Sequence, residues 1–384
     1  MAYQFKLPDY TFMGENALQA SESILRGLGK KAFVVTGKIV TKTCAVQKLT
    51  DCLTKWDISY TVFNDICGEP DTAAIQAGVE AFKRAGCDFL IGIGGGSPLD
   101  SAKAISAMSI LKGSISDYMG VEIKGCFPSV VAIPTTSGTG SEATKFTVIT
   151  DSAKNVKMLL KGDALLPVVA VVDPAFTESA PGGVTAATGM DALTHAIEAY
   201  TSRKGNTLTD LYALDAIKRI FSWLPEAYCD GSNKKAREEM AIAAYEAGVC
   251  INNASVTLVH GMSRPIGALF HVPHGISNAM LITECLAFAL DGCPDRFAKI
   301  ARQIGAVDES KSDREAAGTF IGALKELCWK LEIPTLQEHG IERDAFESNI
   351  KKMAQDAMSS GSPGNTLREI AAEDIAAIYK RLYQ

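Results

Sequence analysis

The first half of the chain alternates short apolar runs with amphipathic stretches. The apolar runs cover residues 32–37, 59–65, 87–96, 129–137 and 167–174. Such runs, separated by helical patterns, are typical of a parallel sheet that helices cover on both faces. The pattern therefore predicts an N-terminal α/β domain built on a Rossmann-like parallel sheet.

The pattern changes near Val184. From there on, Ala, Leu, Glu and Lys recur at helical spacing and no convincing strand is visible. Proline and glycine in the stretch SAPGGVTAA mark the change between the two patterns. We predict an α/β domain over residues 1–184 and an all-α domain over residues 185–384.

Composition excludes several classes of protein. The 384 residues carry a net charge of −6, which gives no electrostatic footprint for nucleic acid or anionic lipid. No signal peptide is visible, and no run reaches the roughly 18 apolar residues of a membrane span. The ten cysteines form no CxxC pair and are typical of reduced thiols. We expect a cytoplasmic protein whose partner is a small molecule.

A glycine-rich turn follows the third apolar run. The sequence Gly94-Gly95-Gly96-Ser97 leads into a helix, and Pro98 suits its first turn. Such a turn lets the backbone approach a phosphate, and it directs the N–H groups of the helix N-terminus at that phosphate. The spacing is not GxGxxG. Taken alone, the turn is equally consistent with a plain strand-to-helix connection.

A second polar turn, residues 134–142, follows the next apolar run and is dense in threonine, serine and glycine. Hydroxyl groups and glycines at such a position suit contacts with phosphate and ribose. Two such turns at strand ends of one domain favour nucleotide binding over two coincidental tight turns.

A metal-ligand pattern occurs in the second half. Asp191 and His195 are four residues apart in a helical segment and so share one helix face. His260 follows in TLVHGMSRP, and His274 closes FHVPHG, where His271 is a rival for the same role. One carboxylate and three imidazoles suit Fe(II) or Zn(II). A histidine in an apolar helix is more often a core residue, but four of the five histidines fall in these apolar segments.

These motifs together resemble the iron-containing (group III) alcohol dehydrogenase family. The resemblance extends over essentially the whole chain, and it is carried by four segments: GGGSPLDSAK, PTTSGTGSEAT, ATGMDALTHAIEAY and VHGMSRPIGALFHVPHGISNA. It implies a dehydroquinate synthase-like fold, with a nucleotide domain and a helical metal domain, usually in a homodimer or a higher homo-oligomer.

The resemblance also assigns roles to residues. It implies metal ligation, and catalysis through the metal, by Asp191, His195, His260 and His274, which favours His274 over His271. It implies contacts with NAD(H) or NADP(H) by residues of both turns and one later lysine: Gly95, Gly96, Ser97, Pro98, Asp100, Thr135, Thr136, Thr139 and Lys157.

The chain departs from the family pattern beside the metal motif. Many members carry a second histidine one turn after the first HG ligand, where this chain has Arg264. Arginine does not give up a proton at neutral pH, so a proton relay through this position is doubtful. Arg264 could orient a polar substrate or a phosphate, or it could form a structural ion pair. His271 is a second candidate for a titratable group near the site.

A further departure concerns the nucleotide. The first apolar run ends in Gly37, where many NAD-preferring members place an aspartate that binds the ribose hydroxyls and repels a 2′-phosphate. Lys38 and Lys42 offer positive charge nearby. We therefore expect that NADP(H) is accepted.

The expected reaction is hydride transfer between NAD(P)(H) and a short primary alcohol or its aldehyde, diols and hydroxyaldehydes included, with a divalent metal, Fe(II) or Zn(II), at the substrate oxygen. Alternatives are a glycerol dehydrogenase or maleylacetate reductase, a dehydroquinate synthase-like lyase, and a metallohydrolase. The hydrolase would need a base such as Glu198 beside the metal.

Overall fold

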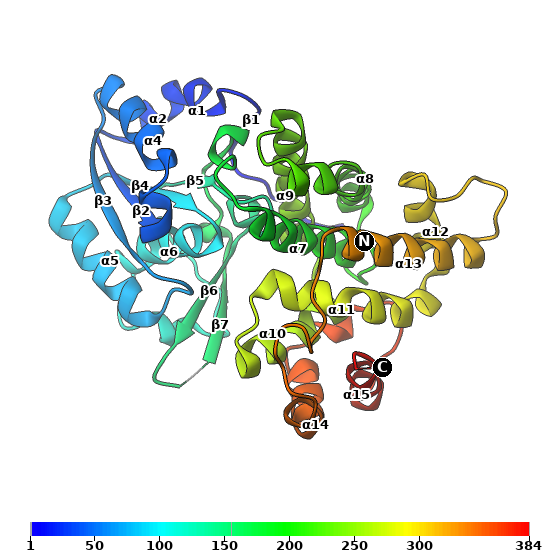
Figure 1. Ribbon diagram of the computed structural model, residues 1–384. Helices are drawn as coiled ribbons and strands as arrows, with labels where there is room; N and C mark the ends of the chain where they lie inside the picture. Colours follow the sequence, from blue (N-terminus) through cyan, green and yellow to red (C-terminus); the bar gives the residue numbers. More distant parts are fainter. Residues whose placement is uncertain (1, 155, 384) are drawn as a thin grey trace. The chain divides into compact units, whose positions relative to one another are not determined.

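A computed structural model describes residues 2–154 and 156–383 (Figure 1). Its N-terminal part contains a parallel six-stranded sheet, and neighbouring strands follow the order β1-β8-β5-β4-β2-β3. The strands are β1 (Tyr10–Met13), β2 (Lys31–Gly37), β3 (Ser59–Ile66), β4 (Phe89–Gly94), β5 (Val130–Pro134) and β8 (Val169–Val172). The predicted parallel sheet is confirmed, and every predicted run contains one of its strands.

Side chains of the central strands alternate between two apolar layers. In β2, Phe33 and Val35 join one buried cluster, whereas Ala32 and Val34 join the other. The first cluster is covered by α5 (Thr72–Ala85) and α6 (Gly96–Met108), the second by α1 (Ala17–Ala20), α2 (Glu22–Leu28) and α4 (Cys44–Lys55). Both faces of these strands are therefore buried, which explains why they are apolar at successive positions.

The covering helices begin and end at residues suited to those positions. Asp71 accepts a hydrogen bond of 2.8 Å from the N–H of Ala74 at the start of α5, and Gly86 ends that helix in the left-handed conformation. Thr43 caps α4 in the same way as Asp71 caps α5.

The strand order reverses between β2 and β4. The chain passes from β2 outward to β3 and then returns to β4 on the other side of β2. Val35 pairs with Gly92, so the carboxyl ends of both strands lie side by side, with Gly37 at one end and Gly94 at the other. In open parallel sheets, ligands bind at such a reversal. The predicted phosphate-binding turn lies at this position.

Two features of this part were not predicted. β1 joins the edge of the sheet beside β8, and β6 (Phe146–Asp151) pairs antiparallel with β7 (Val156–Lys161) in a separate hairpin. Both β6 and β7 expose alternate residues, and β1 is largely exposed. None of the three therefore shows the continuous apolar run that identified the buried strands.

The C-terminal part is helical. No strand occurs among its described residues, as predicted. Its helices are α7 (Gly182–Tyr200), α8 (Thr207–Cys229), α9 (Lys234–Asn253), α10 (Leu258–Phe270), α11 (His274–Ala289), α12 (Pro294–Gln303), α13 (Asp313–Lys330), α14 (Arg343–Ser359) and α15 (Ala372–Arg381). They bury one continuous apolar core. Asn206 and Ser312 form capping boxes at the starts of α8 and α13.

The chain forms two compact units, which comprise mainly residues 3–180 and 181–384. The predicted boundary after residue 184 lies four residues later, within the first turns of α7, and it stays a prediction. No helix among the described residues is long and apolar enough to cross a membrane. All ten cysteines are free thiols.

Candidate metal centre and nucleotide-binding turns

The helical unit brings the four predicted ligands together. Asp191 and His195 lie one turn apart on α7, His260 lies in the first turn of α10, and His274 is the first residue of α11. The Oδ1 atom of Asp191 lies 3.8 Å from Nε2 of His195 and 3.5 Å from Nε2 of both His260 and His274. Three helices thus bring the Nε2 atoms of three histidines around one carboxylate oxygen.

A close approach of two helices positions His274. The next residue, Gly275, faces α7, and a Cβ atom there would collide with the carbonyl oxygen of Ala187. Because glycine has no side chain, the N-terminus of α11 can pack directly on α7. This packing places the His274 ring beside Asp191.

The donor set fits a divalent cation. Ligand atoms of Asp191, His195 and His260 all lie within 4.8 Å of one another, and His274 adds the fourth donor. Donors that share a cation at about 2.1 Å in tetrahedral geometry lie roughly 3.4 Å apart, close to the spacings around Asp191. The amide oxygen of Asn278 is buried here and has no hydrogen-bond partner among the described residues. The amide nitrogen of the same residue faces Asp191, His260 and His274, and an unsatisfied buried acceptor next to such a group can mark an ordered water or an ion.

Glu198 orients one of the candidate ligands. This residue follows His195 by three positions on α7 and is completely buried. Its Oε2 atom lies 2.6 Å from Nδ1 of His260, and its Oε1 atom accepts hydrogen bonds from Thr257 and from the N–H of Val259. With Nδ1 as donor to Glu198, Nε2 is the nitrogen of His260 that faces Asp191, and its lone pair is available to a cation when the ring is neutral.

Asn278 makes the second supporting contact. It lies one turn after His274 on α11 and is completely buried. Its Nδ2 atom donates to Oδ1 of Asp191 at 2.7 Å and lies 3.2 Å from Nε2 of both His260 and His274. Sequence reasoning missed this role. The available signals were the i, i+4 spacing of Asn278 from His274 and the i, i+3 spacing of Glu198 from His195.

Two buried carboxylates make the centre attractive to positive charge. Burial alone would raise the pKa of Asp191, but the charges of His195 and His274 and the hydrogen bond with His260 hold it well below its usual range. Burial likewise opposes ionisation of Glu198, and the charge of His260 keeps that pKa low. Burial would lower the pKa of His260, but Glu198 and Asp191 raise it to about 9. The same field favours a bound cation.

The two uncertain candidates lie in different surroundings. His271 ends α10 in the left-handed conformation with φ 56°, and its side chain is exposed. Arg264 lies in the middle of α10, is half-buried, and donates from Nη1 to the hydroxyl of Ser362 at 3.0 Å. It forms no ion pair with a carboxylate in the part of the chain that the structure describes. The structural ion pair considered for Arg264 is therefore not observed.

The glycine-rich turn forms the start of α6. Gly94 has φ 152°, and a Cβ atom there would lie 2.6 Å from Cγ of Pro98, so only glycine fits without strain. Gly95 is the N-cap of α6, and no side chain caps this terminus. The first N–H groups of α6 are therefore available to an anion.

The threonine-rich turn packs against the glycine-rich turn. A Cβ atom on Gly95 would lie 3.5 Å from Oγ1 of Thr136, and one on Gly96 would lie 3.1 Å from Cγ2 of Thr139. Thr135 is buried and donates its N–H to the carbonyl of Gly94 at 2.9 Å. The two predicted turns thus form one continuous surface.

Asp100 is hydrogen-bonded to a residue of the threonine-rich turn and to a residue that follows that turn. Its Oδ1 atom accepts a hydrogen bond of 2.5 Å from Ser141, and its Oδ2 atom accepts one of 2.8 Å from the N–H of Val148. The buried Lys103 donates to Ser141 at 2.7 Å and lies 3.7 Å from Asp100. Both oxygens of Asp100 are therefore committed to protein groups, and its observed contacts are those of a residue that positions the turns.

The remaining nucleotide candidates lie elsewhere in the same unit. Lys157 on β7 forms an ion pair with Glu69. Gly37 ends β2, and Lys38 begins the short helix α3 (Lys38–Thr41), where its ammonium lies 3.9 Å from Asp65. Both side chains of this last pair are mostly exposed, so the pair is weak.

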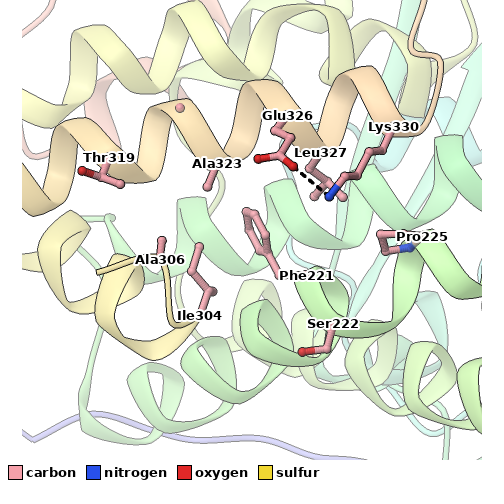
Figure 2. Close-up of a pocket in the computed structure, with 11 residues that line it drawn as sticks. Phe221, Ser222, Pro225, Ile304, Ala306, Thr319, Ala323, Glu326, Leu327 and Lys330 are labelled. Carbon is pink, nitrogen blue, oxygen red and sulfur yellow. Dashed lines mark ion pairs between the residues drawn. The ribbon is translucent and has the colours of Figure 1, made fainter. Parts of the chain in front are cut away.

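The helical unit also has a surface pocket between α8, the segment after α12, and α13 (Figure 2). Apolar residues such as Phe221 and Ile304 line it, and an ion pair of 2.8 Å joins Glu326 and Lys330 at its edge. None of the candidate site residues lines this pocket.

The chain was compared with known families and structures. Residues 8–174 match the family described as iron-containing alcohol dehydrogenase, and residues 185–383 match the C-terminal part of the Fe-containing alcohol dehydrogenase family. The NAD-dependent methanol dehydrogenase of Bacillus methanolicus is 37% identical over 98% of both chains. The 1,3-propanediol dehydrogenase of Citrobacter freundii is 35% identical over 99% of both. A crystal structure of a 1,3-propanediol oxidoreductase superimposes with a TM-score of 0.96 at 35% identity, covering 100% of each chain.

Fold and relatives define the class of protein: this is an oxidoreductase of the alcohol dehydrogenase type. More specifically, the chain belongs to the iron-containing alcohol dehydrogenase family, as its motifs suggested. Membership implies a bound metal and a nicotinamide cofactor. The lyase and hydrolase alternatives receive no support, and Glu198, the base required for hydrolysis, is fully engaged by His260 and its neighbours.

Proposed function

We propose that the protein interconverts short primary alcohols, diols included, and their aldehydes with NAD(H) or NADP(H). The observation that carries this proposal is the convergence of three imidazoles on one oxygen of Asp191, with Glu198 hydrogen-bonded to one of them, that of His260. Relatives named for methanol and 1,3-propanediol support a small substrate.

The four ligands we propose are Asp191, His195, His260 and His274. A cation bound by them supplies Lewis-acid polarisation of the substrate oxygen. Glu198 holds the Nδ1 proton of His260, so that Nε2 stays an acceptor. Asn278 holds Oδ1 of Asp191 in place through its amide N–H. Asp191, His195 and His260 are buried, which fixes their positions before substrate binds, whereas the His274 side chain is 45% exposed.

The cofactor carries the redox chemistry. In the direction of reduction, bound NADH or NADPH would supply the hydride, and solvent or a donor group would supply the proton. We propose that the N-terminus of α6 binds the pyrophosphate through N–H groups of Gly96 and Ser97. Thr136 and Thr139 border the same turn and support this role.

Several finer points belong to the proposal. The ligand set admits both iron and zinc, and elemental analysis of anaerobically purified protein distinguishes them. The family resemblance favours a homo-oligomer, which light scattering tests. A cytoplasmic location is in keeping with ten free cysteines.

The central test follows the absorbance of NADH or NADPH after addition of short aldehydes to metal-loaded protein. We expect aldehyde-dependent loss of absorbance. His274→Ala is expected to abolish it while nucleotide binding stays intact, whereas His339→Ala, at an exposed histidine, leaves it unchanged. Full activity in metal-free His274→Ala protein would refute the proposed site.

A further inference from the structure

Arg264 shares a helix face with a proposed metal ligand. It lies four residues after His260 on α10, so both side chains project from the same side of that helix. Gly261 lets α10 approach the loop at Pro363, since a Cβ atom there would lie 2.7 Å from that proline. This close approach brings Ser362 within hydrogen-bond distance of the guanidinium.

The guanidinium lacks the partner that other half-buried arginines have. Arg219, Arg296 and Arg302 each form ion pairs with carboxylates. Arg264 has one neutral partner, the hydroxyl of Ser362, among the described residues. Burial lowers the pKa of Arg264, and Glu198 offsets this only in part. Most of the five N–H donors of Arg264 are unused by the described residues and open to solvent, so they remain available to a ligand that offers several acceptor oxygens.

The charges around Arg264 leave it unneutralised. Glu198 contributes an attractive field, but its two oxygens are taken by His260, Thr257 and backbone N–H groups. After burial, the charge of Arg264 is among the causes that lower the pKa of His274, so its field extends to the metal ligands. A divalent cation is balanced by the carboxylates of Asp191 and Glu198. When the two carboxylates balance a divalent cation, the positive charge of Arg264 is left without a negative partner.

We propose that Arg264 is a specificity-determining residue that binds an anionic group of the substrate. The substrate class is a short aldehyde, or the matching alcohol, that carries a carboxylate or a sulfonate. The planar guanidinium binds two oxygens of such a group at once, and it stays charged at every relevant pH. Ser362 fixes the orientation of the fork through Nη1. This inference rests on the proposed function.

The shared chemistry, an anion with several oxygens, could also come from the diphosphate of the nicotinamide cofactor. The two sources are separable, because only a substrate anion changes the choice between aldehydes. Steady-state kinetics should compare 4-oxobutanoate with butanal and 2-oxoethanesulfonate with propanal. We expect the wild-type kcat/KM to favour the anionic member of each pair by about tenfold or more.

Arg264→Gln should reduce this preference by about tenfold to a hundredfold through a higher KM for the anionic aldehyde, because a charge-assisted contact is lost. Arg264→Lys should restore part of it, and Ser362→Ala should lower it moderately. Arg314→Gln removes the same charge from a side chain that is 86% exposed and should leave the preference unchanged. A wild-type enzyme with no anionic preference, or equal losses for both aldehydes in Arg264→Gln, overturns the proposal.

Two measurements separate the remaining outcomes. If Arg264→Gln weakens NADH or NADPH binding and leaves aldehyde selectivity unchanged, the anion is that of the cofactor and the inference is wrong. Calorimetry with ethanesulfonate and propanoate on metal-loaded protein does not depend on turnover. If the wild type binds these anions and Arg264→Gln does not, the inference is supported. If in addition no aldehyde is reduced, only the proposed function fails. Equal binding by both proteins contradicts the inference.

Discussion

The Oε2 atom of Glu198 lies 2.6 Å from Nδ1 of His260, and both residues are buried. One hydrogen bond thereby selects the nitrogen of His260 that faces Asp191. A carboxylate behind a ligating imidazole is a common device for fixing the tautomer and the orientation of the ring. In this chain the device comes from the helix that also carries Asp191 and His195.

We predict that Glu198→Gln weakens metal binding. The amide nitrogen of glutamine would donate to Nδ1 of His260, so the ring proton would move to Nε2, where it blocks ligation. Loss of such a supporting group typically costs roughly 10- to 100-fold in metal affinity. Competition between a chromophoric chelator and chelator-treated, reloaded protein measures the effect. Glu326→Gln, at an exposed glutamate of the same unit, is the control. Unchanged affinity in Glu198→Gln would show that the bond does not select the tautomer.

Adjacent glycines of the phosphate-binding turn should respond differently to alanine. Gly95→Ala fits the fold, because φ is −72° and the new methyl group meets Thr136 at ordinary contact distance. The new methyl group crowds the N-terminus of α6, so we expect about tenfold weaker binding of NADH and NADPH with an unchanged Tm.

Gly94→Ala forces a Cβ atom onto Pro98 at φ 152° and should lower the free energy of unfolding by about 1–3 kcal/mol. Fluorescence titration and thermal unfolding measure the two effects. Normal nucleotide affinity in Gly95→Ala would argue against this turn as the pyrophosphate site.

Cofactor choice should depend on Gly37. No carboxylate side chain is present at this position at the end of β2, and Lys38 lies next to it. We expect NADPH to be used at least as efficiently as NADH. Gly37→Asp should shift the ratio of kcat/KM values toward NADH by about tenfold or more, because a carboxylate binds the ribose hydroxyls and repels a 2′-phosphate. A wild-type preference for NADH of about a hundredfold would contradict the expectation.

Glu142 should make stability depend on pH. Burial raises its pKa to about 7, from 4.5 in an exposed chain. Between these values the folded protein keeps a proton that the unfolded chain releases, so the free energy of unfolding falls as pH rises from 4.5 to 7. Glu142→Gln cannot ionise. We expect its Tm at pH 8, relative to that at pH 5, to exceed the wild-type difference by about 2–5 °C.

The matched control for this prediction is Glu122→Gln, an exposed glutamate whose substitution should leave the pH dependence of Tm unchanged. If Glu142→Gln and the wild type show the same dependence on pH, Glu142 is ionised in the folded protein across the whole range.

The sequence pattern predicted the buried strands well, because residues that helices cover on both faces are apolar throughout. It missed the hairpin of β6 and β7, whose alternate residues are exposed and whose pairing is with each other rather than with the sheet. A half-exposed strand leaves a short and weak signal. The family resemblance assigned Asp100 to the cofactor, but the sequence could not show that Ser141 and Val148, more than 40 residues away in the chain, hold its carboxylate.

The candidate metal site shows the same division. The sequence alone determined that Asp191 and His195 share a face of one helix, because helical periodicity is local. The residue pattern also proposed His260 and His274, and the family motifs favoured His274 over its neighbour His271. Only the tertiary structure decided that their ring nitrogens meet at one oxygen of Asp191, that Glu198 and Asn278 support them, and that Arg264 has no carboxylate partner. These relationships join residues on different helices, whose distances are set by side-chain packing between the helices rather than by spacing along the chain.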